Sequence, residues 1–299
     1  MSSPRADFER RMHRVLAHVD AHLAGTLDLA TLAAVANFSP FHFHRLFAAW
    51  TGETLADYVR RRRVETAAVQ LLAQPRLSVL NAALGVGFGS AEAFARAFRA
   101  RFGAAPSVWR AAQRKDDQAD RKIGQAGRPA PHDDGSTMNT SPPADVRLLD
   151  LPPVRIAYLR HLGAYGAPLQ RFWARSVAPW LVLHGRDGRI TYGISHDDPG
   201  VTRAPACRYD AGVALADGET PGRDELVAEL PGGRYAVLRF DGPVDRIGEG
   251  WTLLLRDWLP GTGLQLDARP CFERYPPDGG YDADSGRLRC EICVPVAPL

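Results

Sequence analysis

Four consecutive arginines, Arg60–Arg63, form the densest group of side chains in this chain that could bind a ligand by charge. Guanidinium groups bind phosphate oxygens, and residues 1–114 carry a net charge of +7, against −3 for residues 145–299. A basic region confined to one part of a chain is typical of a polyanion partner. A solvated helix face would explain the same run. The predicted phosphate contacts are those of Arg60, Arg61 and Arg62.

The sequence around these arginines predicts two helix-turn-helix units between Leu29 and Arg110. In the second copy, Gly85 and Gly87 supply the backbone freedom that a sharp corner between two helices needs. Ser90 can cap the helix that follows, because its hydroxyl accepts one of the orphan N–H groups there. The buried stripe of that helix repeats every four residues and consists of Phe94, Phe98 and Phe102.

The first copy has Asn37–Ser39 as its corner and Pro40 at the first helical position. Its predicted buried stripe leaves His44 and Arg45 more exposed, and consists of Phe43, Leu46, Phe47 and Trp50. A helix from about Thr54 to Leu72, about 28 Å long, would join the two copies. Successive major grooves on one side of DNA lie about 34 Å apart, so one chain could read two of them. We predict double-stranded DNA as a partner.

Residues 8–112 resemble the DNA-binding domain of the AraC/XylS family of transcription regulators. The matching positions are Ser39, Arg45, Leu46, Phe47, Gly52, Tyr58, Arg63, Ala67, Leu71, Leu72, Phe94, Arg96, Phe98, Gly103, Pro106 and Arg110. The resemblance implies that Phe41, His44 and Arg45 lie where the family reads base edges. An arginine there can bind guanine O6 and N7 together.

In the second unit the resemblance implies a DNA-facing set of Ser90, Glu92 and Arg96. Ala91 and Ala93 on that face depart from a strongly polar reading surface. This helix is therefore expected to contribute methyl contacts and phosphate anchoring, and the first unit to read bases directly. A regulator of this kind is also expected to have RNA polymerase as a partner.

Length and composition predict two domains in the 299 residues. We place a DNA-binding domain at 1–112, a flexible linker rich in glycine and proline at 113–144, and a second domain at 145–299. No apolar run approaches the about 20 residues of a membrane helix, and the first residues lack a secretory core. We expect a cytoplasmic protein with no membrane partner and no cofactor.

Cys290 and Cys293 have the C-x-x-C spacing that a metal or redox site would use. They fall on a predicted strand, where residues three apart point to opposite faces. We therefore predict structural thiols and no metal site.

The second half of the chain contains an internal repeat at an offset of 79 residues. Its first members are Ala157, Leu159, Arg160 and Gly163, which recur as Ala236, Leu238, Arg239 and Gly242. Each repeat is predicted to form a strand, a helix and two further strands. The predicted ranges are 154–160, 169–184, 190–195 and 207–215, then 233–240, 245–258, 270–275 and 288–296. We expect an α+β domain that is a duplicated β-α-β-β unit, behind an α-helical first domain.

This second half resembles the GyrI-like effector-binding domain. The matching stretches are Arg160–Tyr165, Gly193–Pro199, Leu230–Val237 and Glu291–Val296. The resemblance implies a cleft between the repeats for bulky, often cationic or amphiphilic molecules, and places the family's characteristic acid at Glu291. A carboxylate facing a dry pocket favours a ligand cation that compensates it, unless an arginine such as Arg160 or Arg239 does so. The predicted aromatic lining consists of Tyr209, Trp251, Phe272 and Tyr275, which would attract a cation through their π faces.

We therefore predict a sequence-specific transcriptional regulator whose second domain senses a bulky small molecule. Two alternatives remain open. Relatives of the second domain include hydrolases that open strained electrophilic rings with a pocket carboxylate, although no Ser/His/Asp, Cys/His or metal constellation is present here. The second domain could also be a protein-interaction module that binds no ligand. We predict no catalytic residues and no enzymatic activity.

Overall fold

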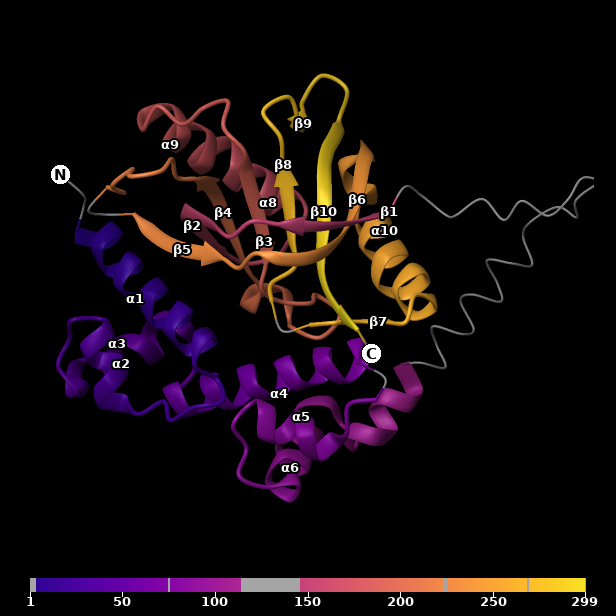
Figure 1. Ribbon diagram of the computed structural model, residues 1–299. Coiled ribbons are helices and arrows are strands. Elements are labelled where there is room, and N and C mark those ends of the chain that lie inside the picture. Colours follow the sequence, from indigo (N-terminus) through magenta and orange to yellow (C-terminus); the bar gives the residue numbers. More distant parts are fainter. Residues whose placement is uncertain (1–3, 75, 114–145, 223–224, 268, 299) are drawn as a thin grey trace, which may run out of the picture. The chain divides into compact units, whose positions relative to one another are not determined.

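The computed structural model describes residues 4–74, 76–113, 146–222, 225–267 and 269–298. The chain divides into two compact units, one formed by Ser3–Ser141 and the other by Pro142–Leu299 with Met1–Ser2 (Figure 1). The predicted linker at 113–144 lies outside the described residues from residue 114 onward. None of the described helices is long and apolar enough to cross a membrane.

The N-terminal unit is α-helical, and two of its helix pairs form helix-turn-helix units, α2–α3 and α5–α6. The helices are α1 (Pro4–Ala21), α2 (Leu29–Val35), α3 (Pro40–Thr51), α4 (Leu55–Ala73), α5 (Val79–Gly85) and α6 (Ala91–Phe102). The corners are as predicted, because Asn37 (φ 55°) and Gly87 (φ 87°) take the left-handed conformation there. The long α4 joins the two units and begins one residue after its predicted start.

Local side chains determine where these helices begin. Ser39, Thr54 and Ser90 each precede a helix and accept a hydrogen bond from a backbone N–H three residues later. Each of these caps satisfies one of the N–H groups that a helix leaves unpaired at its first turn. The predicted capping role of Ser90 is confirmed, with 3.1 Å between the Ala93 nitrogen and the Ser90 hydroxyl.

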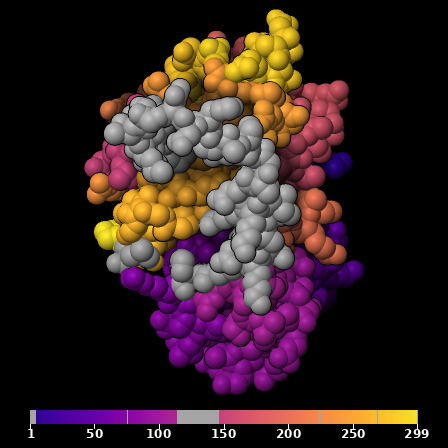
Figure 2. Space-filling model, turned by 90° about the vertical axis from the view of Figure 1, so that its right-hand side faces the viewer, coloured from indigo at the N-terminus to yellow at the C-terminus, as the bar shows by residue number. Residues whose placement is uncertain are grey.

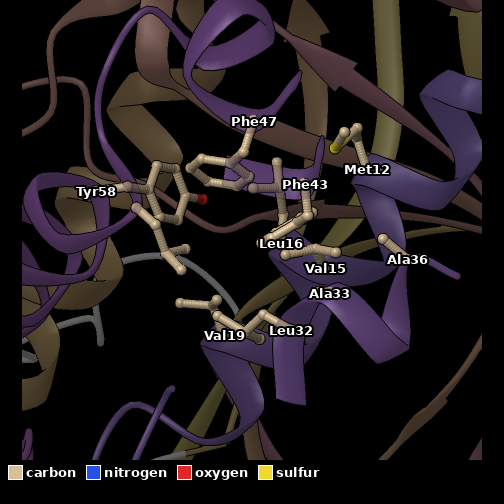
Figure 3. Packing of buried hydrophobic residues seen from close by; sticks show 11 residues of the cluster. Met12, Val15, Leu16, Val19, Leu32, Ala33, Ala36, Phe43, Phe47 and Tyr58 are labelled. Carbon is tan, nitrogen blue, oxygen red and sulfur yellow. The ribbon is translucent and has the colours of Figure 1, made fainter. Parts of the chain in front are cut away.

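A hydrophobic core holds the first helix-turn-helix unit against α1. Met12, Leu16 and Val19 of α1 are buried together with Phe43 and Phe47 of α3 (Figure 3). Figure 3 also shows the rings of Phe47 and Tyr58 turned toward one another, at 5.4 Å between centroids, which joins α3 to α4. Leu46 and Trp50, the other members of the predicted stripe, are partly buried against the same core.

The second helix-turn-helix unit has an aromatic core. Phe94 and Phe98 are fully buried, and Phe98 packs edge-on against Trp109 at 5.4 Å between ring centroids. Phe102 lies 4.6 Å from Phe98, so the predicted four-residue stripe is the inner face of α6. Glu92 and Arg96 lie off this stripe and are exposed.

The C-terminal unit is a curled antiparallel sheet that in the described residues has ten strands, with helices packed on it (Figure 1). Its strands are β1 (Val146–Leu151), β2 (Val154–Leu162), β3 (Thr191–Ser195), β4 (Arg208–Ala214), β5 (Leu226–Leu230), β6 (Gly233–Pro243), β7 (Leu264–Leu266), β8 (Phe272–Tyr275), β9 (Gly280–Asp282) and β10 (Arg287–Pro298). The main path is β1-β6-β10-β8-β3-β4-β2-β5. The equivalent strands of the two repeats are β2 and β6, β3 and β8, and β4 and β10, each repeat being preceded by β1 or β5. Replacing each strand by its equivalent gives the same path read backwards, so the predicted duplication is present. Figure 2 shows residues of both repeats, from pink to yellow, on one face of this unit.

Two strands of the main path were not predicted. β1 precedes the first repeat but pairs with β6 of the second, and β5 precedes the second repeat but pairs with β2 of the first. Each repeat therefore completes the sheet of the other. β1 and β5 are short apolar stretches, and proline separates each from the strand that follows it in the sequence. Such stretches do not by themselves indicate that each pairs with the other repeat.

The helices of the two repeats cover one face of the sheet. They are α8 (Ala167–Phe172) with α9 (Ala178–Leu183), and α10 (Ile247–Thr252). Both predicted helices occur, but each includes a π-helical turn, at Trp173–Val177 and at Leu253–Trp258. Such turns are frequent at functional sites.

Candidate functional site

The exposed face of α3 carries the residues that were predicted to read DNA. Phe41 is 70% exposed. His44 and Arg45 are also exposed, whereas Phe43 and Phe47 of the same helix are buried. Helical periodicity thus places all three candidate readers outside the core.

The arginine run divides into different environments. Arg60 has a 59% exposed side chain and pairs with Asp57 at 2.9 Å on the helix surface. Arg61 and Arg62 are instead held at the buried carboxylate of Glu65, at 2.9 and 3.6 Å, and Arg62 also reaches Asp20 at 3.3 Å. The Arg62 side chain is only 6% exposed. The prediction that Arg62 contacts a phosphate is therefore corrected, because this side chain is used inside the unit.

Arg61 also departs from the prediction, although less completely. Its guanidinium forms a bidentate pair with Glu53, at 2.6 Å from Nη2 to Oε1 and 3.2 Å from Nε to Oε2, and its side chain is 15% exposed. Arg101 of α6 reaches Glu65 as well, at 3.0 Å. Arg61 and Arg62 thus contribute to an internal network of ion pairs around Glu65. Of the three predicted phosphate contacts, Arg60 remains on the surface.

A groove of about 880 Å³ crosses the N-terminal unit. It extends from His44 of α3, past Arg60 on α4, to Gly87 and Phe88 at the corner before α6. The groove therefore connects the candidate reading face of the first unit with the entry to the second recognition helix. Its remaining lining residues are Ala24, Gly25, Thr26, Leu27, Leu29, Thr54, Leu55, Ala56, Val59 and Arg63.

A second candidate site lies in the C-terminal unit and is centred on Glu273 of β8. This carboxylate is 6% exposed and accepts hydrogen bonds from Tyr209 at 3.0 Å, Tyr275 at 2.5 Å and the Trp251 indole at 3.1 Å. Among the described residues no arginine, lysine or histidine lies within ion-pair distance of it. Burial raises the pKa of Glu273, and the three donors oppose that rise.

The donors come from both repeats and from a helix. Tyr209 lies on β4 of the first repeat, whereas Tyr275 lies beside Glu273 on β8 and Trp251 lies on α10 of the second. Trp173, where the π-helical turn of the first repeat begins, packs edge-on against Tyr275 at 5.5 Å between ring centroids. The result is an acid surrounded by aromatic rings. Burial also raises the pKa of both tyrosines.

Glu291 was predicted to be the acid that faces the ligand. The structure corrects this prediction, because Glu291 lies on the other face and is paired with arginines. Glu291 pairs in register with Arg274, so it lies on the face of the sheet opposite Glu273. Its carboxylate is 2.7 Å from the Arg274 Nε and 3.8 Å from the Arg239 Nε. Glu291 is therefore already neutralised by protein cations, and the alternative that an arginine such as Arg239 compensates it is supported.

Phe272 is also on the opposite face, where it packs against Tyr192 and Tyr235 at ring centroid distances of 5.8 and 5.2 Å. Of the five predicted ligand residues, the structure brings together Tyr209, Trp251 and Tyr275, and separates Phe272 and Glu291 from them. Glu273 was not predicted. Strand alternation could have indicated it, because residues 273 and 275 share a face of the sheet and Tyr275 was predicted to line the pocket.

The two cysteines of the C-x-x-C pair lie on opposite faces of the sheet. In the part of the chain that the structure describes, no group of three metal-binding side chains occurs. Cys290 packs in the helix-covered core, whereas Cys293 belongs to the core of the opposite face, as their spacing predicted. Burial raises the pKa of Cys293 to about 12, which leaves this thiol protonated and unreactive.

The fold and both sites together define a DNA-binding helix-turn-helix unit combined with a unit that has a buried acid among aromatic rings. Comparison with known proteins agrees. The profile of a helix-turn-helix domain matches residues 32–112, and that of the GyrI-like small molecule binding domain matches residues 144–297. The chain belongs to the AraC/XylS family of transcriptional regulators and has a GyrI-like domain at its C-terminal end.

Three relatives illustrate this composition. The Right origin-binding protein of Escherichia coli is 25% identical over 296 residues, which cover 94% of this chain and 96% of that protein. The SPbeta prophage-derived protein YosT of Bacillus subtilis is 32% identical over 152 residues, or 50% of this chain and 98% of YosT. Regulatory protein SoxS of Escherichia coli is 33% identical over 96 residues, or 32% of this chain and 89% of SoxS.

Proposed function

We infer that this regulator binds a specific DNA sequence with its N-terminal unit and senses a bulky, amphiphilic or cationic molecule at Glu273. The observation that carries the inference is a buried carboxylate with no cation beside it among the described residues. An ionised carboxylate in such a place is costly unless a positive charge compensates it. A ligand cation would supply that charge, and the surrounding rings would supply apolar contact and cation–π attraction.

The side chains around Glu273 also favour a flat or bulky ligand. Glu273 itself is buried, whereas Trp251 and Trp173 above it are partly exposed. Trp251 is held to Glu273 by one N–H and packs against the neighbouring core, so a ligand that displaces this indole must replace one hydrogen bond and these apolar contacts. An aromatic cation would then replace the ring contact, and its positive charge would face the carboxylate.

For the DNA side, we infer that Arg45 and His44 contact base edges and that Arg60 contacts a phosphate. Phe41 would add apolar contact with a thymine methyl group. On α6, Glu92 and Arg96 are exposed and Ser90 remains a cap that can also reach the backbone. The groove past Arg60 would then hold the sugar-phosphate backbone between two half-sites. We expect RNA polymerase as the protein partner and no chemical turnover of the effector.

The test is calorimetric titration of the full chain with tetraphenylphosphonium and with the neutral triphenylphosphine oxide. Tetraphenylphosphonium has no hydrogen-bond donor, so the charge of Glu273 can attract it only by Coulomb interaction, and Glu273→Gln should weaken binding of the cation roughly tenfold, which is about 1.4 kcal/mol. Binding of the neutral compound should change little. Glu291→Gln is the matched control and should leave both affinities within about threefold, since Glu291 faces the other way. Equal weakening of both compounds, or a loss confined to the control, contradicts the sensor assignment.

A further inference from the structure

We propose that Arg63 is a positioning residue that determines which spacing between two DNA half-sites this chain accepts. The proposal rests on the proposed function, because it assumes that both recognition helices bind DNA. Arg63 lies on α4 and is the last arginine of the run, yet it forms no ion pair among the described residues. Each of its three guanidinium nitrogens donates to a backbone carbonyl group.

Arg63 donates to three carbonyl oxygens of two different segments. Its Nε donates to Leu23 at 2.9 Å and its Nη2 to Gly25 at 2.7 Å, both in the loop after α1. Its Nη1 donates to Gly87 at 2.9 Å, in the corner of the second helix-turn-helix. One planar group therefore joins the loop of the first unit to the corner that leads into α6.

The two segments are also in direct contact. A Cβ atom added to Gly87 would lie 2.7 Å from the Leu23 oxygen and 2.9 Å from the Ala24 oxygen. Gly87 has φ +87°, so both its backbone conformation and its surroundings require glycine. The corner before α6 is thus pressed against the loop after α1, and α1 itself packs in the core of the first unit.

Two other arginines each join the central helix to another helix. Arg62 joins α4 to Asp20 of α1, and Arg101 joins α6 to Glu65 of α4. Arg63 donates to both the loop of the first unit and the corner of the second. Without it, the two recognition helices would be related through α4, the ion pairs around Glu65 and the close contact of Gly87 with the loop after α1, none of which is a hydrogen bond from one side chain to both units.

Spacing is the property that this link should control. One additional base pair moves the second half-site by about 3.4 Å and turns it by about 35° around the DNA axis. A chain whose recognition helices are rigidly related cannot follow that change without breaking the three carbonyl contacts. A chain that lacks them can rotate one unit and keep both helices in their grooves.

The experiment uses the full chain and its own DNA site, obtained by binding-site selection. Duplexes are prepared with the two half-sites unchanged and the spacer altered by −2 to +2 base pairs, and their relative affinities are measured by competition. Wild type should prefer its own spacing over a change of one base pair by about tenfold or more. Arg63→Met, which removes all five donors, should reduce that preference to within about threefold.

Two further variants keep the test decisive. Arg63→Lys retains the charge and the stem but cannot donate to both segments, so it should also relax the spacing preference, even if Arg63→Met does not fold. Arg5→Met is the matched control, because Arg5 is 88% exposed and pairs with Glu9 on the same helix. It should keep the wild-type preference.

The outcomes separate this proposal from its premise. If wild type binds no selected DNA, the proposed function fails. If wild type binds and both Arg63 variants keep its spacing preference, the positioning role is overturned while DNA binding stands. A fall in the salt dependence of binding by about one unit for Arg63→Met, with spacing preference retained, would show a phosphate contact instead.

Discussion

Tyr209 donates a hydrogen bond to Glu273 across an intervening strand, with 3.0 Å between its hydroxyl and the Glu273 Oε2. Tyr209 lies on β4 and Glu273 on β8, and β3 runs between them. The phenol can cross β3 because it passes over Gly193. A Cβ atom at that position would lie 1.8 Å from the Tyr209 hydroxyl and 2.8 Å from the Glu273 Oε2.

Gly193→Ala should therefore disrupt the contact between Tyr209 and Glu273. The added methyl group must displace the Tyr209 side chain, and overpacking of this kind costs about 1–3 kcal/mol. We expect a loss of that size in the unfolding free energy of the C-terminal unit, measured by denaturant titration, together with weaker binding of tetraphenylphosphonium. Gly248→Ala is the control, since a Cβ there meets nothing within 4 Å. Equal stability of the two variants would contradict the close contact.

The pKa of Glu273 predicts a pH dependence with a definite sign. Burial raises the pKa of Glu273 in the folded state, so the folded chain binds this proton more tightly than the unfolded chain does. The resulting stabilisation is complete below the unfolded pKa of about 4.3 and is lost as pH rises through the folded value. The C-terminal unit should thus lose stability from acidic toward neutral pH.

Thermal unfolding of wild type and Glu273→Gln between pH 4.5 and 8 measures this effect. The glutamine variant should be more stable than wild type at neutral pH, and the difference should shrink toward pH 4.5. The exposed Glu229→Gln serves as control and should follow wild type throughout. A neutral-pH destabilisation by Glu273→Gln would mean that the ionised carboxylate is already compensated.

The sequence predicted those features that local physics determines. Capping at Ser90, the corner at Gly87 and the phenylalanine stripe of α6 depend on neighbours within one or two turns, and all were correct. The residues that escaped prediction depend on distant partners. Arg62 is buried because Asp20 and Glu65 meet it in space, and nothing in four consecutive arginines reveals which of them faces inward.

The choice between two glutamates shows the same limit on the C-terminal side. Glu291 and Glu273 both lie in apolar strands, and the motif around Glu291 resembled the family more closely. What separates them is the cross-strand neighbour, because Arg274 lies in register with Glu291 and neutralises it. Strand pairing of this kind is set by the whole sheet, including the exchanged β1 and β5.

Arg60 and Arg62 should behave differently although they are two residues apart. Arg60→Ala should weaken binding to all DNA sequences alike and reduce the slope of log affinity against log salt by about one unit. Arg62→Ala should instead destabilise the N-terminal unit, because it removes a buried partner of Asp20 and Glu65. Anisotropy titrations at several salt concentrations, alongside thermal unfolding, distinguish the two. If Arg62→Ala is fully folded and its salt slope is reduced, Arg62 contacts a phosphate after all.

Arg45 should determine sequence preference at one position of the DNA site. It is exposed on α3 beside His44, and an arginine in that place can bind guanine O6 and N7 with two parallel hydrogen bonds. Arg45→Ala should cost about 1–3 kcal/mol on the selected site and should relax preference at a single base pair. The measurement is a competition series in which each base pair of the site is replaced in turn. Arg5→Ala, which removes the same charge from the exposed start of α1, should leave the whole profile unchanged. If Arg45→Ala weakens specific and random DNA by the same factor, Arg45 holds the backbone and the bases are read by other residues of α3.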